Sequence, residues 1–471
     1  MRQILPRSAY GLAGVLLAAS LTTGCLGQSQ DTDPDRNADV KEFTLTIASN
    51  AIKGGKNSEA AAWIEDWVIP QFVKAQKAKG VTAKVVFEPS GVDDEDYKGK
   101  ISLDMQSGKG ADIIDLDGIW IGEFAESGYI APLDEVVGAE TVGAWEGWKH
   151  IPDAVEQNGS YKGKRYGIPA GTDGRVIYYN KELFSKAGLP TDWQPTSWKD
   201  ILDAAKTIKR ELPGVVPLQL NAGTAMGEAT TMQGFLPLLA GTGAQIYSDG
   251  KWLGNSEEIR QVLDLYRQVY AGGLGDPILQ KEAKGRDKSF QMFAENRIAI
   301  LLEGDYFWRS VVDPDDGIAP MENRDEVVGY AKIPAMRPGA GVRGQDFVSM
   351  SGGSARVINP NTKYPQQAWE LLTFMASAEA IKAELGDSAR ITARQDVNAD
   401  VLANDPMLSF VAEEVLPLTS YRPSLAEYPE VSLALQEATL AVVDGTPVDK
   451  AAADYQAKLE TILDGKDNIA S

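Results

Sequence analysis

The sequence contains one cysteine and one histidine in 471 residues, and each scarcity excludes a class of protein. A single cysteine, Cys25, cannot form an intrachain disulfide, and together with His150 it cannot supply the ligand set of a His/Cys zinc site. A Ser–His–Asp triad would have to use His150, which we interpret as a surface or loop residue. No Walker-type phosphate loop is present, and no G-x-G-x-x-G run follows a predicted strand. We therefore expect neither a metal nor a cofactor.

Basic residues are also in short supply. The chain has 46 Lys and Arg against 67 Asp and Glu, which gives a net charge of −21. Nucleic acids are bound through clustered Lys and Arg, so this charge argues against a nucleic-acid partner and against peripheral binding to anionic lipid. The length is enough for two or three domains with sizeable cores, and the 43% hydrophobic content is ordinary for a globular protein.

No hydrophobic run is long enough to span a bilayer. The apolar segment 10–21 follows Arg2 and Arg7 and is shorter than the roughly 20 residues of a membrane-spanning helix, so it is typical of a secretion signal. The run Leu21-Thr22-Thr23-Gly24-Cys25 resembles the lipobox of bacterial lipoproteins, although Thr22 stands where Leu is usual. The alternative is an ordinary secretory leader with an accidental cysteine. We predict a signal peptide over 1–24, lipid on Cys25 that anchors the body outside the cell membrane, and a flexible tether over 25–40.

Strand and helix patterns alternate from about Lys41 onward. Residues 43–48, 81–87 and 111–116 have strand patterns, and apolar residues at helical spacing lie between them. This order predicts an α/β architecture with a largely parallel sheet. The same alternation of strand and helix patterns continues in the later part of the chain. Further strands are predicted at 176–179, 297–302 and 347–350, and helices after Ser197, after Ser256, over 364–385 and over 448–463.

Five segments, in order, resemble family 1 extracellular solute-binding proteins, the sugar-capturing lipoproteins of ATP-binding-cassette importers. Any one segment is weakly specific, but five with sensible spacing over roughly residues 41–465 are specific at the family level. The segments are Gly110–Asp134 with its Glu123-Phe124-Ala125 run, Tyr166–Leu189 with Tyr178-Tyr179-Asn180-Lys181, Pro195–Trp198, Phe293–Tyr306, and Gly352–Leu372 with Ala368-Trp369-Glu370.

The resemblance implies a class II periplasmic-binding-protein fold, in which two α/β lobes joined by hinge crossovers close on a ligand. The chain would cross near residues 169–175, again just before Phe347, and again near Arg390. Lobe 1 is then expected to contain 41–172 with 347–390, and lobe 2 to contain 173–346 with 391–471. The protein is expected to act as a monomer without catalysis, and to deliver its ligand to the membrane permease of an importer.

Candidate ligand contacts lie where strands end, because ligands of open α/β sheets sit beyond the carboxyl ends of the strands. Sugar hydroxyls need carboxylates, amides or arginines, and the C–H faces of sugar rings need flat aromatic rings. Asp117 and Trp120 follow a predicted strand, with a helix cap and core packing as their structural alternatives. The resemblance adds an acid at the first crossover and an aromatic residue of the cleft. The full set of candidates is Asp173, Tyr306, Asp117, Trp120, Asn50, Gly353, Trp308 (the alternative to Tyr306) and Arg390.

The expected ligand is a disaccharide or oligosaccharide. Other interpretations stay open: a lipoprotein that senses its ligand for a receptor kinase, another cargo such as polyamine or glycerol phosphate, or an exported carbohydrate-active enzyme with two catalytic carboxylates. The Tyr178-Tyr179 pair is also found in iron-binding relatives, but strand alternation would send the two rings to opposite faces.

Overall fold

A computed structural model describes residues 33–55, 57–315, 317–386 and 388–470. The predictions of a signal peptide and of lipid on Cys25 fall outside these residues, as does the first part of the predicted tether. None of the helices in the described ranges combines the length and the apolar character that a bilayer crossing requires.

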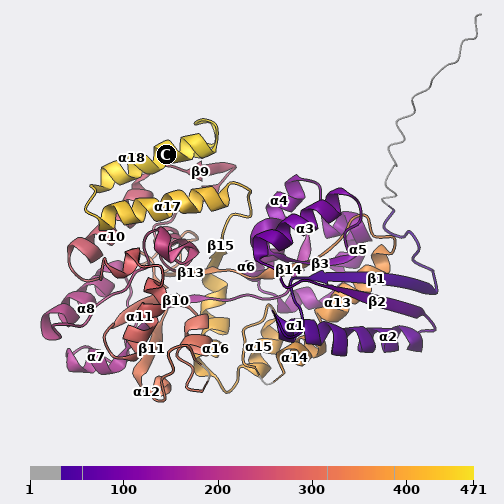
Figure 1. Cartoon of the computed structure of the whole chain (residues 1–471), viewed down its shortest axis with the longest axis horizontal. Helices are drawn as coiled ribbons and strands as arrows, with labels where there is room; N and C mark the ends of the chain where they lie inside the picture. The colour runs from indigo at the N-terminus through magenta and orange to yellow at the C-terminus, as the bar shows by residue number, and fades with distance from the viewer. Residues whose placement is uncertain (1–32, 56, 316, 387, 471) are drawn as a thin grey trace, which may run out of the picture. The chain divides into compact units, whose positions relative to one another are not determined.

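The first lobe is built on a five-stranded sheet in the order β2-β1-β3-β14-β6 (Figure 1). The strands β1, β2 and β3 run parallel, as the sequence predicts, whereas β14 runs antiparallel to both of its neighbours. Buried aliphatic side chains from the strands pack against helices on the two faces of the sheet. The strand bounds are β1 Glu42–Ser49, β2 Thr82–Pro89, β3 Ile113–Asp117, β6 Gly167–Pro169 and β14 Ser354–Ile358.

A continuous helical stretch covers one side of this sheet. It comprises α1 (Ser58–Ala62), a π-helical segment and α2 (Ile69–Ala78). Pro70 lies in the first turn of α2, directly after the π-helical segment, and the helical stretch continues through it. On the other side, α3 (Asp94–Gln106) packs with α4 (Ile121–Glu126) in a separate apolar cluster.

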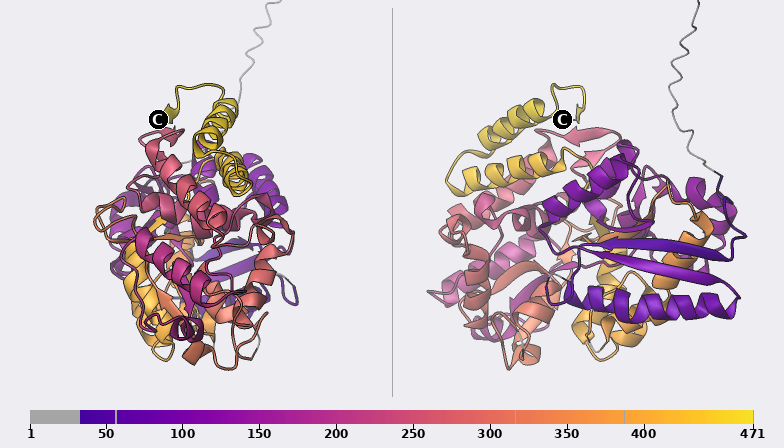
Figure 2. Two further views of the ribbon diagram at one scale, coloured as in Figure 1. Left: turned by 90° about the vertical axis from the view of Figure 1, so that its left-hand side faces the viewer. Right: turned by 45° about the vertical axis from the view of Figure 1, so that its right-hand side comes forward.

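The second lobe contains three three-stranded sheets in the described ranges, β10-β7-β11, β12-β13-β15 and β16-β9-β8, the last made of β8 (Tyr247–Ser248), β9 (Lys251–Leu253) and β16 (Ile469–Ala470). Ser197 and Ser256 cap α8 and α10, as their spacing predicts. The last two helices, α17 and α18, lie side by side on this lobe (Figures 1 and 2). The bounds are β7 Arg175–Asn180, β10 Ile300–Gly304, β11 Val328–Ala331, β12 Ile333–Pro334, β13 Phe347–Ser351, β15 Thr419–Tyr421, α8 Trp198–Glu211, α10 Glu257–Ala271, α17 Tyr428–Val443 and α18 Val448–Ile462.

A G-x-G-x-x-G spacing does occur at residues 339–344, in the loop between β12 and β13. A strand follows it, not the helix that a dinucleotide site requires.

The chain passes between the lobes at three places. Residues 170–174 connect β6 to β7. The second crossing was expected before Phe347, but β13 pairs with β12 and β15, so the crossing falls at Gly352 and Gly353, just before β14. The third lies after α15 (Gln395–Val401), which packs on the first-lobe helix α14 (Ala378–Leu385). Apart from these crossings, the residue ranges that we predict for the two lobes stay a prediction.

One predicted helix is two helices in the structure. The pattern over 364–385 divides into α13 (Pro365–Met375) and α14. The hydroxyl of Ser377 accepts a hydrogen bond from the Ala380 N–H and starts α14, because a serine side chain offers the backbone a cap in place of a continuing helix.

Residues 33–40 lie against the first lobe and do not behave as a tether. Arg36 donates to the carbonyl oxygens of Thr362 and Pro360, at 2.9 and 2.8 Å, and Val40 packs on the core. The prediction of a flexible tether is therefore wrong for residues 33–40. For residues 25–32, which lie outside the described ranges, it stays a prediction.

Candidate functional site

A cavity of about 580 Å³ opens where four strand ends of the first sheet meet. Asn50 follows the end of β1, Asp117 is the last residue of β3, Ala170 follows β6, and Gly353 precedes β14. Parallel β1 and β3 place their carboxyl ends at one edge, and antiparallel β14 brings its start to the same edge. The first two crossings therefore border the cavity, as expected for a ligand site of an open α/β sheet.

Six of the eight candidate residues line this cavity: Asn50, Asp117, Trp120, Asp173, Gly353 and Arg390. They come from segments far apart in the sequence, which only the sheet topology brings together. Arg309 from the second lobe also reaches it.

Trp308 and Tyr306 are not among the lining residues. Trp308 is only 4% exposed, its indole N–H donates to Asp405 Oδ2 at 3.0 Å, and the Arg324 guanidinium lies 3.9 Å from its ring centre. The π-helical turn Phe307–Val311 carries it into the core, so its role is packing. Tyr306 is half-buried beside the cavity, with its ring 5.8 Å from the guanidinium of Arg309.

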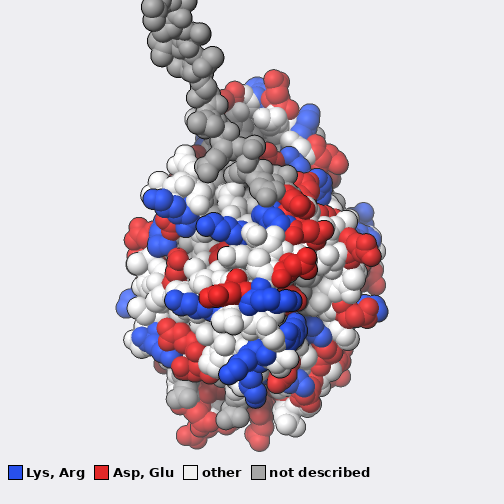
Figure 3. Space-filling view, turned by 90° about the vertical axis from the view of Figure 1, so that its right-hand side faces the viewer, with Lys and Arg blue, Asp and Glu red and all other residues white. Residues whose placement is uncertain are grey.

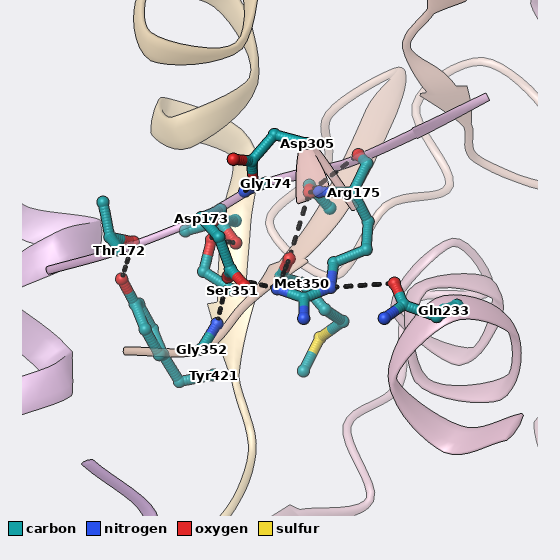
Figure 4. Close-up of polar contacts among 12 residues, drawn as sticks. Thr172, Asp173, Gly174, Arg175, Gln233, Asp305, Met350, Ser351, Gly352 and Tyr421 are labelled. Atoms are coloured by element: carbon teal, nitrogen blue, oxygen red, sulfur yellow. Dashed lines mark hydrogen bonds and ion pairs between the residues drawn. The ribbon is translucent and has the colours of Figure 1, made fainter. Parts of the chain in front are cut away.

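Asp173 connects the first two crossings (Figure 4). Its Oδ1 accepts a hydrogen bond from the Gly352 N–H at 2.6 Å and forms an ion pair with buried Arg175. Arg175 in turn donates from Nε to Gln233 Oε1 at 3.0 Å. Asp173 is thus held in place by two crossings and one second-lobe helix, and it can present only its second oxygen to a ligand.

Asp305 lies behind this network, fully buried. It accepts hydrogen bonds from Arg309 Nε at 3.0 Å and from the Gly174 N–H at 3.3 Å. Burial raises the pKa of Asp305, and the negative charge of Asp173 raises it further, against the opposing charge of Arg309. The first crossing is therefore flanked by two ion pairs, Asp173 with Arg175 and Asp305 with Arg309.

Two polar residues at the cavity edge follow the strands as predicted. Asn50 donates from Nδ2 to the Val92 carbonyl and to Asp94 Oδ1, at 3.1 and 3.0 Å, while its buried Oδ1 has no hydrogen-bond partner among the described residues. Asp117 Oδ1 accepts from the Ile119 N–H at 3.1 Å, which is the helix-cap contact that was its structural alternative. Burial raises the pKa of Asp117, opposed by the charge of Arg422.

Trp120 is 6% exposed and packs beside Tyr97, with ring centres 6.4 Å apart. Both rings line the cavity, so Trp120 combines a packing role with an apolar edge for a ligand.

Arg356 was not among the predicted site residues. It lines the cavity and forms ion pairs with two lining acids, Asp115 and Glu384. Its Nε lies 3.0 Å from Asp115 Oδ1 and its Nη2 lies 3.9 Å from Glu384 Oε2. Arg390 contacts the same Glu384 at 3.2 Å. A charged residue inside the apolar strand Ser354–Ile358 was the signal available, as was Asp115 inside another buried strand.

The cavity can bind groups that donate hydrogen bonds. Carboxylates and an amide oxygen face a space with an aromatic edge, which suits hydroxyl groups and the C–H faces of rings. Within the described ranges, no group of three His, Cys, Asp or Glu side chains is arranged to hold a metal ion.

Comparison with known proteins adds a family-level match. Residues 55–382 match the family model described as "Bacterial extracellular solute-binding protein". The galactooligosaccharide-binding protein of Bacillus subtilis (strain 168) is 24% identical over 422 residues, covering 87% of this chain and 90% of that protein. The maltooligosaccharide ABC transporter solute-binding lipoprotein of Streptococcus pneumoniae serotype 4 is 25% identical over 382 residues, covering 80% of this chain and 78% of that protein.

Among solved structures, the cyclic α-maltosyl-1,6-maltose binding protein from Arthrobacter globiformis is similar with a TM-score of 0.70. The two chains are 19% identical, and the match covers 90% of this chain and 99% of that one. At this identity the likeness concerns the two-lobed fold.

Proposed function

The chain belongs to the bacterial extracellular solute-binding protein family and has a two-lobed class II periplasmic-binding-protein fold, and we propose that it captures a sugar for an ATP-binding-cassette importer. The ligand is a disaccharide or short oligosaccharide held in the cavity beside the crossings. The family is one of binding proteins, and we assign this chain no catalytic step.

The observation that carries this proposal is the cavity at the meeting point of the strand ends. Its volume of about 580 Å³ lies within the roughly 300–1,000 Å³ of ligand pockets. The names of the relatives point to oligosaccharides as the class of ligand. Asn50, Asp117 and Asp173 would accept hydrogen bonds from sugar hydroxyls, and the edge of Trp120 would contact a ring face.

Binding would act through the crossings. Asp173 and Gly353 lie in the segments that join the lobes, so a ligand that contacts them and second-lobe Arg309 would favour the closed arrangement. The shift in population follows the difference in affinity between the open and closed forms.

Delivery completes the proposed role. The closed form would dock as a monomer on the permease subunits of the importer, while lipid on Cys25 keeps the protein at the outer face of the cell membrane. Cys25→Ser should release the protein from the membrane fraction. A membrane-bound Cys25→Ser product with unchanged processing would refute acylation at this site.

A thermal-shift screen of the full-length protein tests the binding function. The screen uses mono-, di- and oligosaccharides, with polyamines and glycerol phosphates as the competing cargoes. A sugar at about 100 times its Kd stabilises the folded state by about 2.7 kcal/mol, or about 3 °C for a chain of this size. A saturable shift with one sugar series is expected. A response confined to polyamines or glycerol phosphates would overturn the proposal, and so would the release of sugar products on prolonged incubation.

A further inference from the structure

We propose that the cavity selects its sugar by charge: it accepts neutral and amino-bearing sugars and rejects those with a carboxylate, sulfate or phosphate. This inference rests on the proposed sugar-binding function and names the class of sugar. Asp117 is the residue that we expect to determine the selection.

The charged residues of the cavity wall are mostly acidic. Among the described residues, six carboxylates and three guanidinium groups line it, so their field favours cations and hydrogen-bond donors. The lining acids are Glu59, Asp94, Asp115, Asp117, Asp173 and Glu384, and the lining arginines are Arg309, Arg356 and Arg390.

Each lining arginine already contacts a carboxylate of the protein. Arg356 lies between Asp115 and Glu384, at 3.0 and 3.9 Å. Arg390 contacts Glu384 at 3.2 Å, and Arg309 contacts buried Asp305 at 3.0 Å. An anionic sugar would have to compete with these internal partners for a cation, because the arginines are committed before the ligand arrives.

Two lining carboxylates, in contrast, each keep one oxygen without a partner within the described ranges, although Asp173 is paired with Arg175 through its other oxygen. Asp117 uses Oδ1 for the Ile119 N–H, and within the described ranges its Oδ2 has no partner. The charge of Arg422 acts on Asp117 and opposes the rise in its pKa, but Arg422 Nη1 contacts Glu228 at 3.2 Å. Both contacts of Asp173 fall on its Oδ1. An additional negative charge here would meet repulsion in a partly desolvated space.

Asn50 provides a second indication that the cavity favours hydrogen-bond donors. It is 8% exposed, and in the described part of the chain its Oδ1 is a buried acceptor without a hydrogen-bond partner. Such an acceptor is costly unless a donor reaches it, so it favours a ligand that brings hydroxyl or amino hydrogens. The ring of Trp120 would also attract an ammonium group placed above its face.

The test compares matched sugars on the full-length protein by calorimetry. The probes are the neutral disaccharides maltose, cellobiose and lactose, and for each the analogue with one hydroxymethyl group replaced by a carboxylate or by an aminomethyl group. For the series that binds, we expect the carboxylate analogue to bind at least about thirtyfold more weakly than the neutral parent, and the amino analogue at least as tightly. The discrimination should grow at low salt, because screening weakens it.

Two variants locate the effect. Asp117→Asn keeps the cap acceptor but removes the charge, and should reduce the discrimination to below about threefold. Asp203→Asn makes the same chemical change on α8, outside the cavity lining, and should leave the discrimination unchanged. An unaltered ratio in Asp117→Asn would overturn the role of Asp117.

The remaining outcomes separate this inference from the function on which it rests. Carboxylate analogues that bind within about threefold of their neutral parents would overturn charge selection while leaving sugar binding in place. Binding of acidic sugars alone would also overturn charge selection while leaving sugar binding in place. No binding by any neutral, amino or acidic sugar would refute the proposed function and charge selection together.

Discussion

Replacing Gly353 with alanine should destabilise the protein where the second crossing meets the first. Gly353 has φ of +144°, a conformation that L-residues rarely adopt. An added Cβ would lie 2.1 Å from the Gly171 carbonyl oxygen and 3.0 Å from Asn158 Nδ2. Backbone oxygen cannot turn aside as a side chain can, so the two crossings would have to move apart.

The magnitude follows from these two terms. A non-glycine residue in such a conformation costs about 1–3 kcal/mol. The overlap with Gly171 adds a similar amount, because relieving it disturbs the crossing segments, so we expect a total loss of about 3–5 kcal/mol in the free energy of unfolding. Since about 1 kcal/mol corresponds to about 1 °C at this chain length, the melting temperature should fall by about 3–5 °C.

Urea unfolding of Gly353→Ala measures this loss, and the adjacent Gly352→Ala is the matched control. A Cβ on Gly352 would meet atoms no closer than 3.7 Å, and its φ is not in the left-handed region, so its cost should stay below about 1 kcal/mol. If the two variants unfold within about 0.5 kcal/mol of each other, the argued close approach of the two crossings is wrong.

Three further predictions concern the cavity and its surroundings. Arg356→Met should cost about 3–5 kcal/mol in urea unfolding, because it leaves Asp115 without its buried cation and Glu384 with Arg390 alone. Arg390→Met, at a side chain 44% exposed, should cost below about 1 kcal/mol. Equal losses would contradict this. Burial raises the pKa of Asp117 above its ordinary 3.8, so the folded state keeps that proton to higher pH than the unfolded chain, and stability falls as pH rises through the raised pKa. Asp117→Asn should therefore be more stable than the parent at neutral pH, with the gain vanishing below about pH 3.8 in thermal melts; a pH-independent difference would refute the shift. Trp308→Phe should lose about 1–2 kcal/mol with its hydrogen bond to Asp405 yet leave sugar affinity within threefold by calorimetry, since Trp308 does not line the cavity.

Much of the local structure could be predicted from the sequence, because it depends on contacts close along the chain. The alternation over 43–48 and the serines at 197 and 256 correspond to β1 and to the caps of α8 and α10. Helix division at Ser377 was missed, since it depends on a local choice between two acceptable backbone states.

The candidate site divides in the same way. Asn50 and Asp117 could be found because they follow strands, and parallel strands end at one edge. Trp308 could not be told from a cleft residue, because one turn of helix decides whether its ring faces solvent or the core. Arg356 lay inside a strand that pairs with partners more than 180 residues earlier, so its contact with Asp115 had no local signal beyond its charge.

Patterns along the chain are enough to establish the class of the molecule: an acidic α/β chain with one cysteine and one histidine, strand-end acids, and the segments by which the family is identified. Which of these acids share a cavity, which arginines are already paired, and where the chain crosses between its lobes depend on the folded arrangement. The physical reason is the distance along the chain over which each kind of interaction acts. Strand and cap preferences act over a few residues, whereas a charged cavity is made by segments that meet only after the sheets have formed.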